Sequence, residues 1–180
     1  MDSPALMTRI MFTTMVEEAG HNLLAYLHRL VGDYEDAKDV LQDTFLAAWQ
    51  AVQKGNPPFI KTRSDEERRR WLYSVASHKG ISLLRRRRLI HWVSLGLIPL
   101  KSFDENLIAE RDALFGAFVH LEPKERSDVL LYIVQRLKIT EIAHMDDIPY
   151  HQARNRIQKA VKRLSAIYFQ LNPVVEEYPR

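Results

Sequence analysis

The sequence contains no cysteine, which excludes disulfide bonds, thiolate zinc sites and redox-active thiols. Only six of the 180 residues are glycine, and few segments alternate apolar with polar residues, so little in the chain favours a β-sheet. The longest apolar run, residues 89–100, is interrupted by His91, Ser94, Gly96 and Pro99, and falls short of the ~18 residues that a membrane span needs. The N-terminus lacks the pattern of a secretion signal. We therefore expect an all-α protein of the cytoplasm, without membrane insertion.

Recognisable catalytic and cofactor motifs are also missing. The seven histidines are scattered and form no HExxH motif, and the chain has neither a glycine-rich phosphate loop nor a nucleophile elbow. Asp36, Asp39 and Asp43 share one face of a predicted helix, but no histidine lies one turn away, and hard metals usually also take oxygen ligands from loops. The sequence therefore predicts no enzyme, no cofactor and no metal, and these carboxylates are expected to face a protein partner or solvent.

Charge is distributed unevenly along the chain. The formal net charge is only +3, yet residues 1–53 carry three basic and eight acidic side chains, whereas residues 54–88 carry eleven basic and three acidic ones. An acidic block beside a basic block suggests two kinds of partner, one of which is a polyanion.

A 3.6-residue apolar period recurs along the sequence and predicts helices. Gly32 ends the first of them, Pro57 and Pro58 follow the second, and Ser64 with Glu67 forms a capping-box pattern before the third. The helix over residues 124–135 is expected to bury Val129, Leu130, Ile133 and Val134. The predicted helices cover residues 17–31, 34–53, 64–88, 109–122, 124–135, 140–145 and 150–171.

Periodicity is lost over residues 90–108, which contain Gly96 and Pro99 and are expected to link two domains. The apolar part of this linker, residues 92–100, is expected to pack on something. The predicted organisation is a first domain over residues 1–89, a second over 109–171, and a tail over 172–180.

Residues 140–164 have the pattern of a helix-turn-helix. Ile142, Ala143, Ile148, Ala153 and Ile157 are spaced so that two short helices can cross over a shared core. The second helix carries side chains suited to base edges and phosphates in a major groove, namely Gln152, Arg154, Asn155, Arg156, Gln158 and Lys159. The alternative is an ordinary antiparallel helix pair with a basic, solvated face.

The third predicted helix interleaves aromatic residues with cations, a pattern that suits single-stranded DNA. Trp71, Tyr73, His78 and Lys79 lie between the arginine runs at 68–70 and 85–88. The alternatives are that Trp71 belongs to the core and that the arginines solvate a helix end.

Several segments together resemble the extracytoplasmic-function sigma factors, small two-domain promoter-recognition subunits of bacterial RNA polymerase. LVGDYEDAKDVLQDTFLAAW (residues 30–49) is similar to the polymerase-binding part of sigma region 2. WLYSVASH (71–78) and LLRRRR (83–88) are similar to its melting and −10-recognising helix. The resemblance to region 4 is carried by LEPKER (121–126), TEIA (140–143) and NRIQKA (155–160).

The resemblance implies roles for individual residues. The side chains expected to bind the polymerase clamp helices are Asp36, Asp39, Gln42, Asp43 and Leu46. Those expected to meet the −10 strand are Arg63, Trp71, Tyr73, His78, Lys79, Arg85, Arg86, Arg87 and Arg88. Those expected to enter the −35 groove are Tyr150, His151, Gln152, Arg154, Asn155, Gln158 and Lys159.

The resemblance further implies core RNA polymerase and promoter DNA as partners, with the β′ clamp helices and the β flap as docking sites and an anti-sigma factor as a further candidate. His78 replaces the family's usual asparagine and Ser82 its usual aspartate, so a divergent −10 element or weak melting is expected. Asp147 replaces the glycine of the helix-turn-helix turn, and aspartate tolerates left-handed backbone better than most residues. The competing hypotheses are a transcription regulator that acts without polymerase and a helical adaptor or sigma antagonist.

Overall fold

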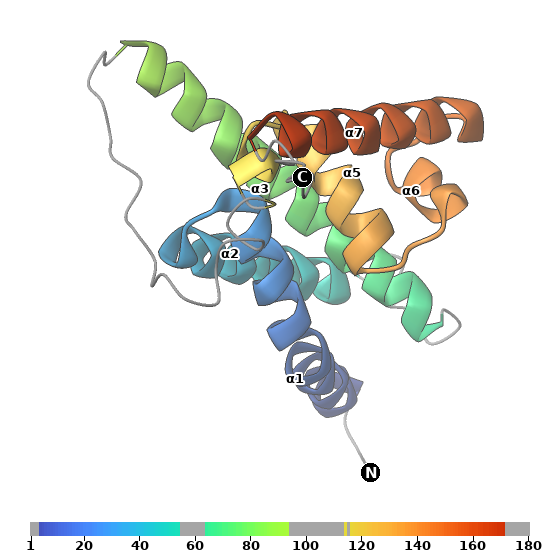
Figure 1. Ribbon diagram of the computed structural model, residues 1–180. Coiled ribbons are helices and arrows are strands. Elements are labelled where there is room, and N and C mark those ends of the chain that lie inside the picture. Colours follow the sequence, from blue (N-terminus) through green and yellow to red (C-terminus); the bar gives the residue numbers. More distant parts are fainter. Residues whose placement is uncertain (1–3, 55–63, 94–113, 115, 172–180) are drawn as a thin grey trace, which may run out of the picture. The chain divides into compact units, whose positions relative to one another are not determined.

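The computed structural model describes residues 4–54, 64–93, 114 and 116–171, and for residues 4–11 and 88–93 it describes the backbone alone. All regular structure within these ranges is helical, which confirms the predicted all-α class (Figure 1). The chain divides into two compact units, one built mainly of residues 1–87 and the other mainly of residues 88–180. Each unit is described by itself.

The first unit begins with α1 (Pro4–Val31) and α2 (Tyr34–Gln53). α1 is longer than the helix predicted over residues 17–31, because its early turns also find apolar partners: Met15 is buried, and the Phe12 ring meets the Trp49 ring of α2 edge-on at 5.1 Å. Gly32, with φ +83°, ends α1 in the left-handed conformation that glycine adopts readily. Asp33 then caps α2 by accepting a 2.9 Å hydrogen bond from the Asp36 amide.

The third helix of this unit, α3, spans Asp65–Val93, so the first residues of the predicted linker, 90–93, are helical. Ser64 caps it as predicted, accepting a 3.3 Å hydrogen bond from the Glu67 amide. Gly80 lies where α1 approaches most closely, since a Cβ there would come within 2.8 Å of Leu30 Cδ2. Residues 94–108 of the predicted linker lie outside the described residues.

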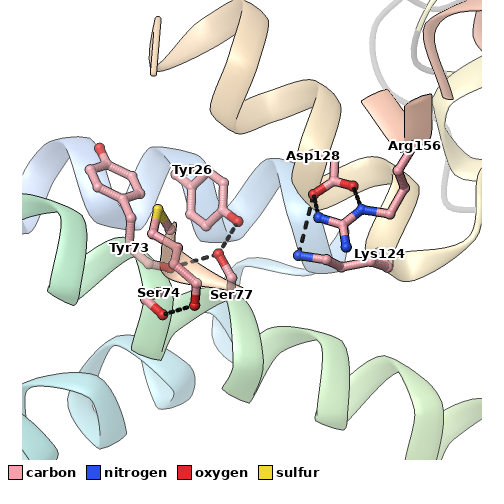
Figure 2. Close-up of polar contacts among 8 residues, drawn as sticks. Tyr26, Tyr73, Ser74, Ser77, Lys124, Asp128 and Arg156 are labelled. Atoms are coloured by element: carbon pink, nitrogen blue, oxygen red, sulfur yellow. Dashed lines mark hydrogen bonds and ion pairs between the residues drawn. The ribbon is translucent and has the colours of Figure 1, made fainter. Parts of the chain in front are cut away.

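A buried hydrogen-bonded pair also joins α1 to α3 (Figure 2). The hydroxyls of Tyr26 and Ser77 are 2.6 Å apart, and Ser77 donates its proton to the carbonyl oxygen of Tyr73, 2.6 Å away. Tyr26 therefore acts as the donor to Ser77, and both buried hydroxyls are satisfied. The surrounding core consists of fully buried apolar residues, chiefly Leu23, Leu27, Leu30, Ala37, Ala48, Leu72 and Ala76.

The second unit contains helical residues at 114 and 116–119, then α5 (Pro123–Val129), which continues into a short π-helix, η1 (Leu130–Val134). The predicted burial is wrong in η1: Ile133 and Val134 are 52% and 46% exposed, and Leu131 is buried in their place. The cause is the i→i+5 hydrogen bond from the Gln135 amide to the Leu130 carbonyl, 2.9 Å, which shifts the helical register by one residue.

The predicted helix-turn-helix is confirmed as a local structure. α6 (Ile139–Met145) and α7 (Tyr150–Leu171) flank a four-residue turn, and α7 has the predicted bounds (Figure 1). Asp147 has φ +53°, the left-handed conformation expected of it, and the Ile148 amide donates to the Ala143 carbonyl at 3.0 Å. The side chains between the helices are small or buried, namely Ile142, Ala143, Ala153 and Ile157.

Candidate nucleic-acid interface

The N-terminal half of α7 presents a continuous row of polar side chains. The helix buries Ala153, Ile157, Ala160 and Leu164 on one face. Every predicted −35 residue lies on the surface of the unit: Tyr150, His151, Gln152, Arg154, Asn155, Gln158 and Lys159 are all exposed. This arrangement offers amide, guanidinium and ammonium groups, the side chains that pair with base edges and phosphates in a major groove.

Arg156 lies in the middle of this row in sequence but points away from it. Its guanidinium binds the carboxylate of Asp128 on α5, with Nε 2.5 Å from Oδ2 and Nη2 3.2 Å from Oδ1 (Figure 2). Asp128 is completely buried and also forms an ion pair with Lys124, whose Nζ lies 3.2 Å from Asp128 Oδ1. Arg156 therefore joins α7 to α5, and it does not belong to the exposed row, contrary to the sequence-based expectation of a DNA-facing side chain.

The acidic face of α2 is largely accessible. Asp39, Gln42, Asp43 and Leu46 are exposed at i, i+3, i+4 and i+7, the spacing of one helical stripe, and Leu46 is 55% exposed. Asp36, predicted to belong to the same surface, differs from the other four because only 15% of its side chain is exposed. Without Asp36, the α2 stripe consists of one exposed apolar side chain, Leu46, beside two carboxylates and one amide.

The predicted −10 residues differ in how far their side chains are exposed. His78, Arg85 and Arg86 are exposed, whereas Trp71 is half-buried. Tyr73 is only 4% exposed, and its ring packs edge-on against Tyr26 at 5.2 Å, so its predicted stacking on a DNA base is wrong. Burial accordingly raises the pKa of the Tyr73 phenol. Arg63 and the side chain of Arg88 lie outside the described residues.

Two further predicted −10 residues, Lys79 and Arg87, pair with carboxylates of α2. Arg87 forms a two-pronged pair with Asp36, with Nη2 2.6 Å from Oδ1 and Nη1 2.5 Å from Oδ2. Lys79 Nζ lies 3.7 Å from Asp43 Oδ2. The predicted polymerase-binding and DNA-binding residues are thus not separate sets, because two of each meet in ion pairs.

Asp36, Asp43 and Lys79 from these pairs line a groove between α2 and α3 of about 570 Å³. One wall is acidic and the other basic, and His78, Ser82 and Leu83 lie along the basic wall. Partial burial in this groove raises the pKa of Asp36, and the adjacent Arg87 guanidinium offsets part of that rise. Within the described ranges, no three histidine, aspartate or glutamate side chains converge on a point where a metal ion could bind.

No helix among the described residues is long and apolar enough to cross a membrane. The sequence matches the profile of the family described as sigma-70 region 2 over residues 15–90, which includes all of α2 and nearly all of α3. The chain is 26% identical to the ECF RNA polymerase sigma factor SigG of Mycobacterium tuberculosis, in a match covering 87% of this chain and 48% of SigG. The chain thus spans about half the length of that relative.

A second relative is closer in length. The ECF RNA polymerase sigma factor SigM of Bacillus subtilis is 23% identical, in a match covering 82% of this chain and 89% of SigM.

Two solved structures share the fold. The sigma factor RpoE of Bartonella quintana, solved with the anti-sigma factor NepR, has a TM-score of 0.67 at 18% identity and covers 87% of this chain and 95% of its own. CnrH, solved with the cytosolic domain of CnrY, has a TM-score of 0.62 at 24% identity and covers 87% of this chain and 86% of its own. These structures show the fold that the chain shares, while the region 2 match shows that residues 15–90 belong to the sigma-70 region 2 family, and the curated relatives that the chain resembles are extracytoplasmic-function sigma factors.

Proposed function

We propose that this chain is a promoter-recognition subunit that binds core RNA polymerase in the cytoplasm and directs transcription initiation. It performs no chemistry itself, since the polymerase carries the catalytic site. Residues 1–89 form the region 2-like domain, 90–108 the linker, 109–171 the region 4-like domain and 172–180 a tail. The further partners in this proposal are promoter DNA and a sigma antagonist, as RpoE of Bartonella quintana was solved with an anti-sigma factor.

The observation that carries the proposal is the exposed row of α7, set on a helix-turn-helix whose apolar face is fully occupied. Arg154 suits a guanine edge, while Gln152, Asn155 and Gln158 suit adenine. Since Arg156 is held by Asp128, the surface left to meet DNA is the one facing away from α5. We assign the −35 element to this surface.

The first unit supplies the other two contacts in this proposal. The α2 stripe of Asp39, Gln42, Asp43 and Leu46 is assigned to the β′ clamp helices, because an exposed leucine flanked by acids suits a basic helical partner. His78, Arg85 and Arg86, exposed on α3, are assigned to the −10 strand. Both surfaces lie within the segment that matches sigma-70 region 2.

The experiment is reconstitution with core RNA polymerase. The full chain is mixed with core enzyme, the complex is isolated by gel filtration, and transcription is measured on fragmented genomic DNA of the source organism. Transcripts starting at sites that core enzyme alone does not use would support the proposal. Stable binding of specific duplex DNA without polymerase would support a regulator instead, and neither activity would support an adaptor.

A charge reversal tests the docking surface within the same assay. Asp39→Lys reverses a charge within the α2 stripe without breaking an ion pair among the described residues, so we expect loss of polymerase association with an unchanged circular dichroism spectrum. Glu18→Lys, an identical charge change at an exposed position of α1, is the control and should still co-elute with core enzyme. Equal loss by both variants would contradict the assignment.

A further inference from the structure

Two carboxylates of α2 lie within ion-pair distance of two cations of α3. Arg87 Nη2 donates a 2.6 Å hydrogen bond to Asp36 Oδ1, and Nη1 lies 2.5 Å from Oδ2, so the guanidinium meets a carboxylate with the charged groups that it would also present to a phosphate. Lys79 faces Asp43 in the same groove, 3.7 Å away. Both pairs connect residues far apart in sequence, so they are properties of the folded unit.

We propose that Asp36 and Asp43 act as internal phosphate mimics that compete with single-stranded DNA for Arg87 and Lys79. This inference rests on the proposed function of α3 as a DNA-binding helix and adds a regulation of that site. In the free protein the two cations are paired with carboxylates, whereas His78, Arg85 and Arg86 are exposed on this helix. DNA binding through the groove then requires that the ion pairs exchange partners.

The two pairs differ in strength. Asp36 is largely buried, with 15% of its side chain exposed, and two nitrogens of Arg87 lie close to its carboxylate. Asp43 is 66% exposed, and one ammonium, that of Lys79, lies near its carboxylate. An exposed single pair contributes little, because water and salt screen it. Asp36 is therefore the stronger competitor, and Asp43 makes a smaller contribution.

The competition predicts a gain of function on removing a negative charge. Asp36→Asn keeps the size of the side chain and releases Arg87 from its charged partner. We expect the free full-length variant to bind a fluorescent oligothymidine about two- to five-fold more tightly than wild type. The plot of log affinity against log salt should steepen by about 0.7, the value for one additional phosphate contact on a single strand. Asp43→Asn should show a smaller gain in the same direction.

Asp39→Asn is the matched control. It removes the same charge from the same groove, but Asp39 forms no ion pair within the described part of the chain, so only the general electrostatic effect remains. A second control places Asp36→Asn in an Arg87→Ala background, where the gain should fall to that of Asp39→Asn. Circular dichroism of each variant establishes that the helices are retained.

Two results would overturn the inference. If Asp39→Asn improves binding as much as Asp36→Asn, the effect is one of net charge, not of pairing. If the gain from Asp36→Asn survives in the Arg87→Ala background, Arg87 is not the group released. Because the assay uses free protein and an oligonucleotide, either result leaves the proposed role with polymerase standing, and that role is tested separately by transcription.

Discussion

At the scale of single residues, Asp33 shows how one side chain begins a helix. It accepts the Asp36 amide proton at 2.9 Å, and this hydrogen bond lowers the pKa of its carboxyl below the usual 3.8. We predict that Asp33→Ala lowers the free energy of unfolding by about 1 kcal/mol near neutral pH, the ordinary value of an N-cap. Urea denaturation of the two proteins measures the difference.

The pH dependence of this contribution has a definite sign. Because the folded-state pKa is lowered, the ionised cap is favoured in the folded state, and its contribution is fully present above pH 3.8 and lost as the pH falls through the folded-state pKa. Asp33→Asn, which caps without ionising, should retain most of the stability and lack this component. A stability difference between wild type and Asp33→Asn that is constant from pH 5 to about pH 2 would contradict the assignment.

His78 allows a second residue-scale prediction, on the proposed melting surface. It is exposed on the basic wall of the groove, at a position where the family usually has asparagine. We expect His78→Ala to impair transcription from duplex promoter much more than from a pre-melted template, with polymerase binding retained. His21→Ala, the same substitution at an exposed position of α1, should affect neither template. Equal losses on both templates would exclude a melting role for His78.

Sequence could identify which residues are polar, but not which of them face each other. Asp36 and Arg87 are 51 positions apart, so no local period indicates that they pair. The arginines that flank Tyr73 in the sequence favour a base-stacking role. In the fold its ring packs against Tyr26 between α1 and α3 instead. The local sequence does not single out Asp128, because Lys124 and Glu125 precede it by one helical turn, and its burial beside Arg156 depends on the packing of α5 on α7.

At the scale of helices, the α1–α3 contact depends on Gly80. A methyl group at Gly80 would come within 2.8 Å of the buried Leu30, while one at Gly20 would meet only Phe45 at 3.9 Å, an ordinary contact. Both glycines lie within helices, where alanine gains up to about 1 kcal/mol in propensity. We predict that Gly20→Ala stabilises the protein and that Gly80→Ala is less stable than it by about 1–3 kcal/mol, the cost of overpacking. Thermal denaturation of both variants measures the difference. Equal stability of the two variants would mean that α1 and α3 can move apart at Gly80 without cost.

A second helix-scale prediction concerns the contact between α5 and α7. Arg156→Ala removes a guanidinium from the fully buried Asp128 carboxylate, and we expect a loss of about 3 kcal/mol in the free energy of unfolding. Arg163→Ala is the matched control on the same helix, since its pair with Glu125 at 3.1 Å is partly exposed and should cost no more than about 1 kcal/mol. Urea unfolding with equal costs for both arginines would show that the buried carboxylate needs no second cation.

The predicted helix bounds agree with the structure where capping residues mark them, and differ from it where tertiary packing determines the length or register of a helix. Gly32 correctly predicts the end of α1, Ser64 predicts the start of α3, and the predicted start of α7 at Tyr150 is confirmed. The π-helix after α5 has no such marker, because apolar residues fill every position from 129 to 134 and a period cannot be assigned within them. The early turns of α1 were missed for a related reason, since contacts with α2 stabilise them.

At the scale of the whole molecule, the two proposed DNA-binding surfaces belong to two separate units. Each offers few side chains, so specific binding by the free chain should be weak, and polymerase is expected to fix the spacing at which both act together. The two surfaces also differ in chemistry. α7 presents amides beside cations and suits base recognition, whereas the open face of α3 is arginine-rich and suits phosphates.

This difference leads to the last prediction, which compares Gln158→Ala on α7 with Arg86→Ala on α3 in reconstituted holoenzyme. Gln158→Ala removes no charge, so we expect it to relax base preference in the −35 element by about 1–3 kcal/mol while the salt dependence stays as in wild type. Arg86→Ala removes one phosphate contact, so binding should weaken on all promoters alike and the salt dependence should flatten by about 0.7–0.9.

Selection from a partly randomised promoter library, followed by titration at several salt concentrations, measures both properties. Arg29→Ala, which removes an exposed arginine from α1, controls for the general effect of net charge and should change neither. If Gln158→Ala and Arg86→Ala give the same promoter preferences and the same salt dependence, the two units do not divide recognition between bases and backbone. If Gln158→Ala changes the −35 preference and Arg86→Ala does not, the α7 row contacts base edges. An uncharged amide can favour one promoter sequence over another only through such contacts.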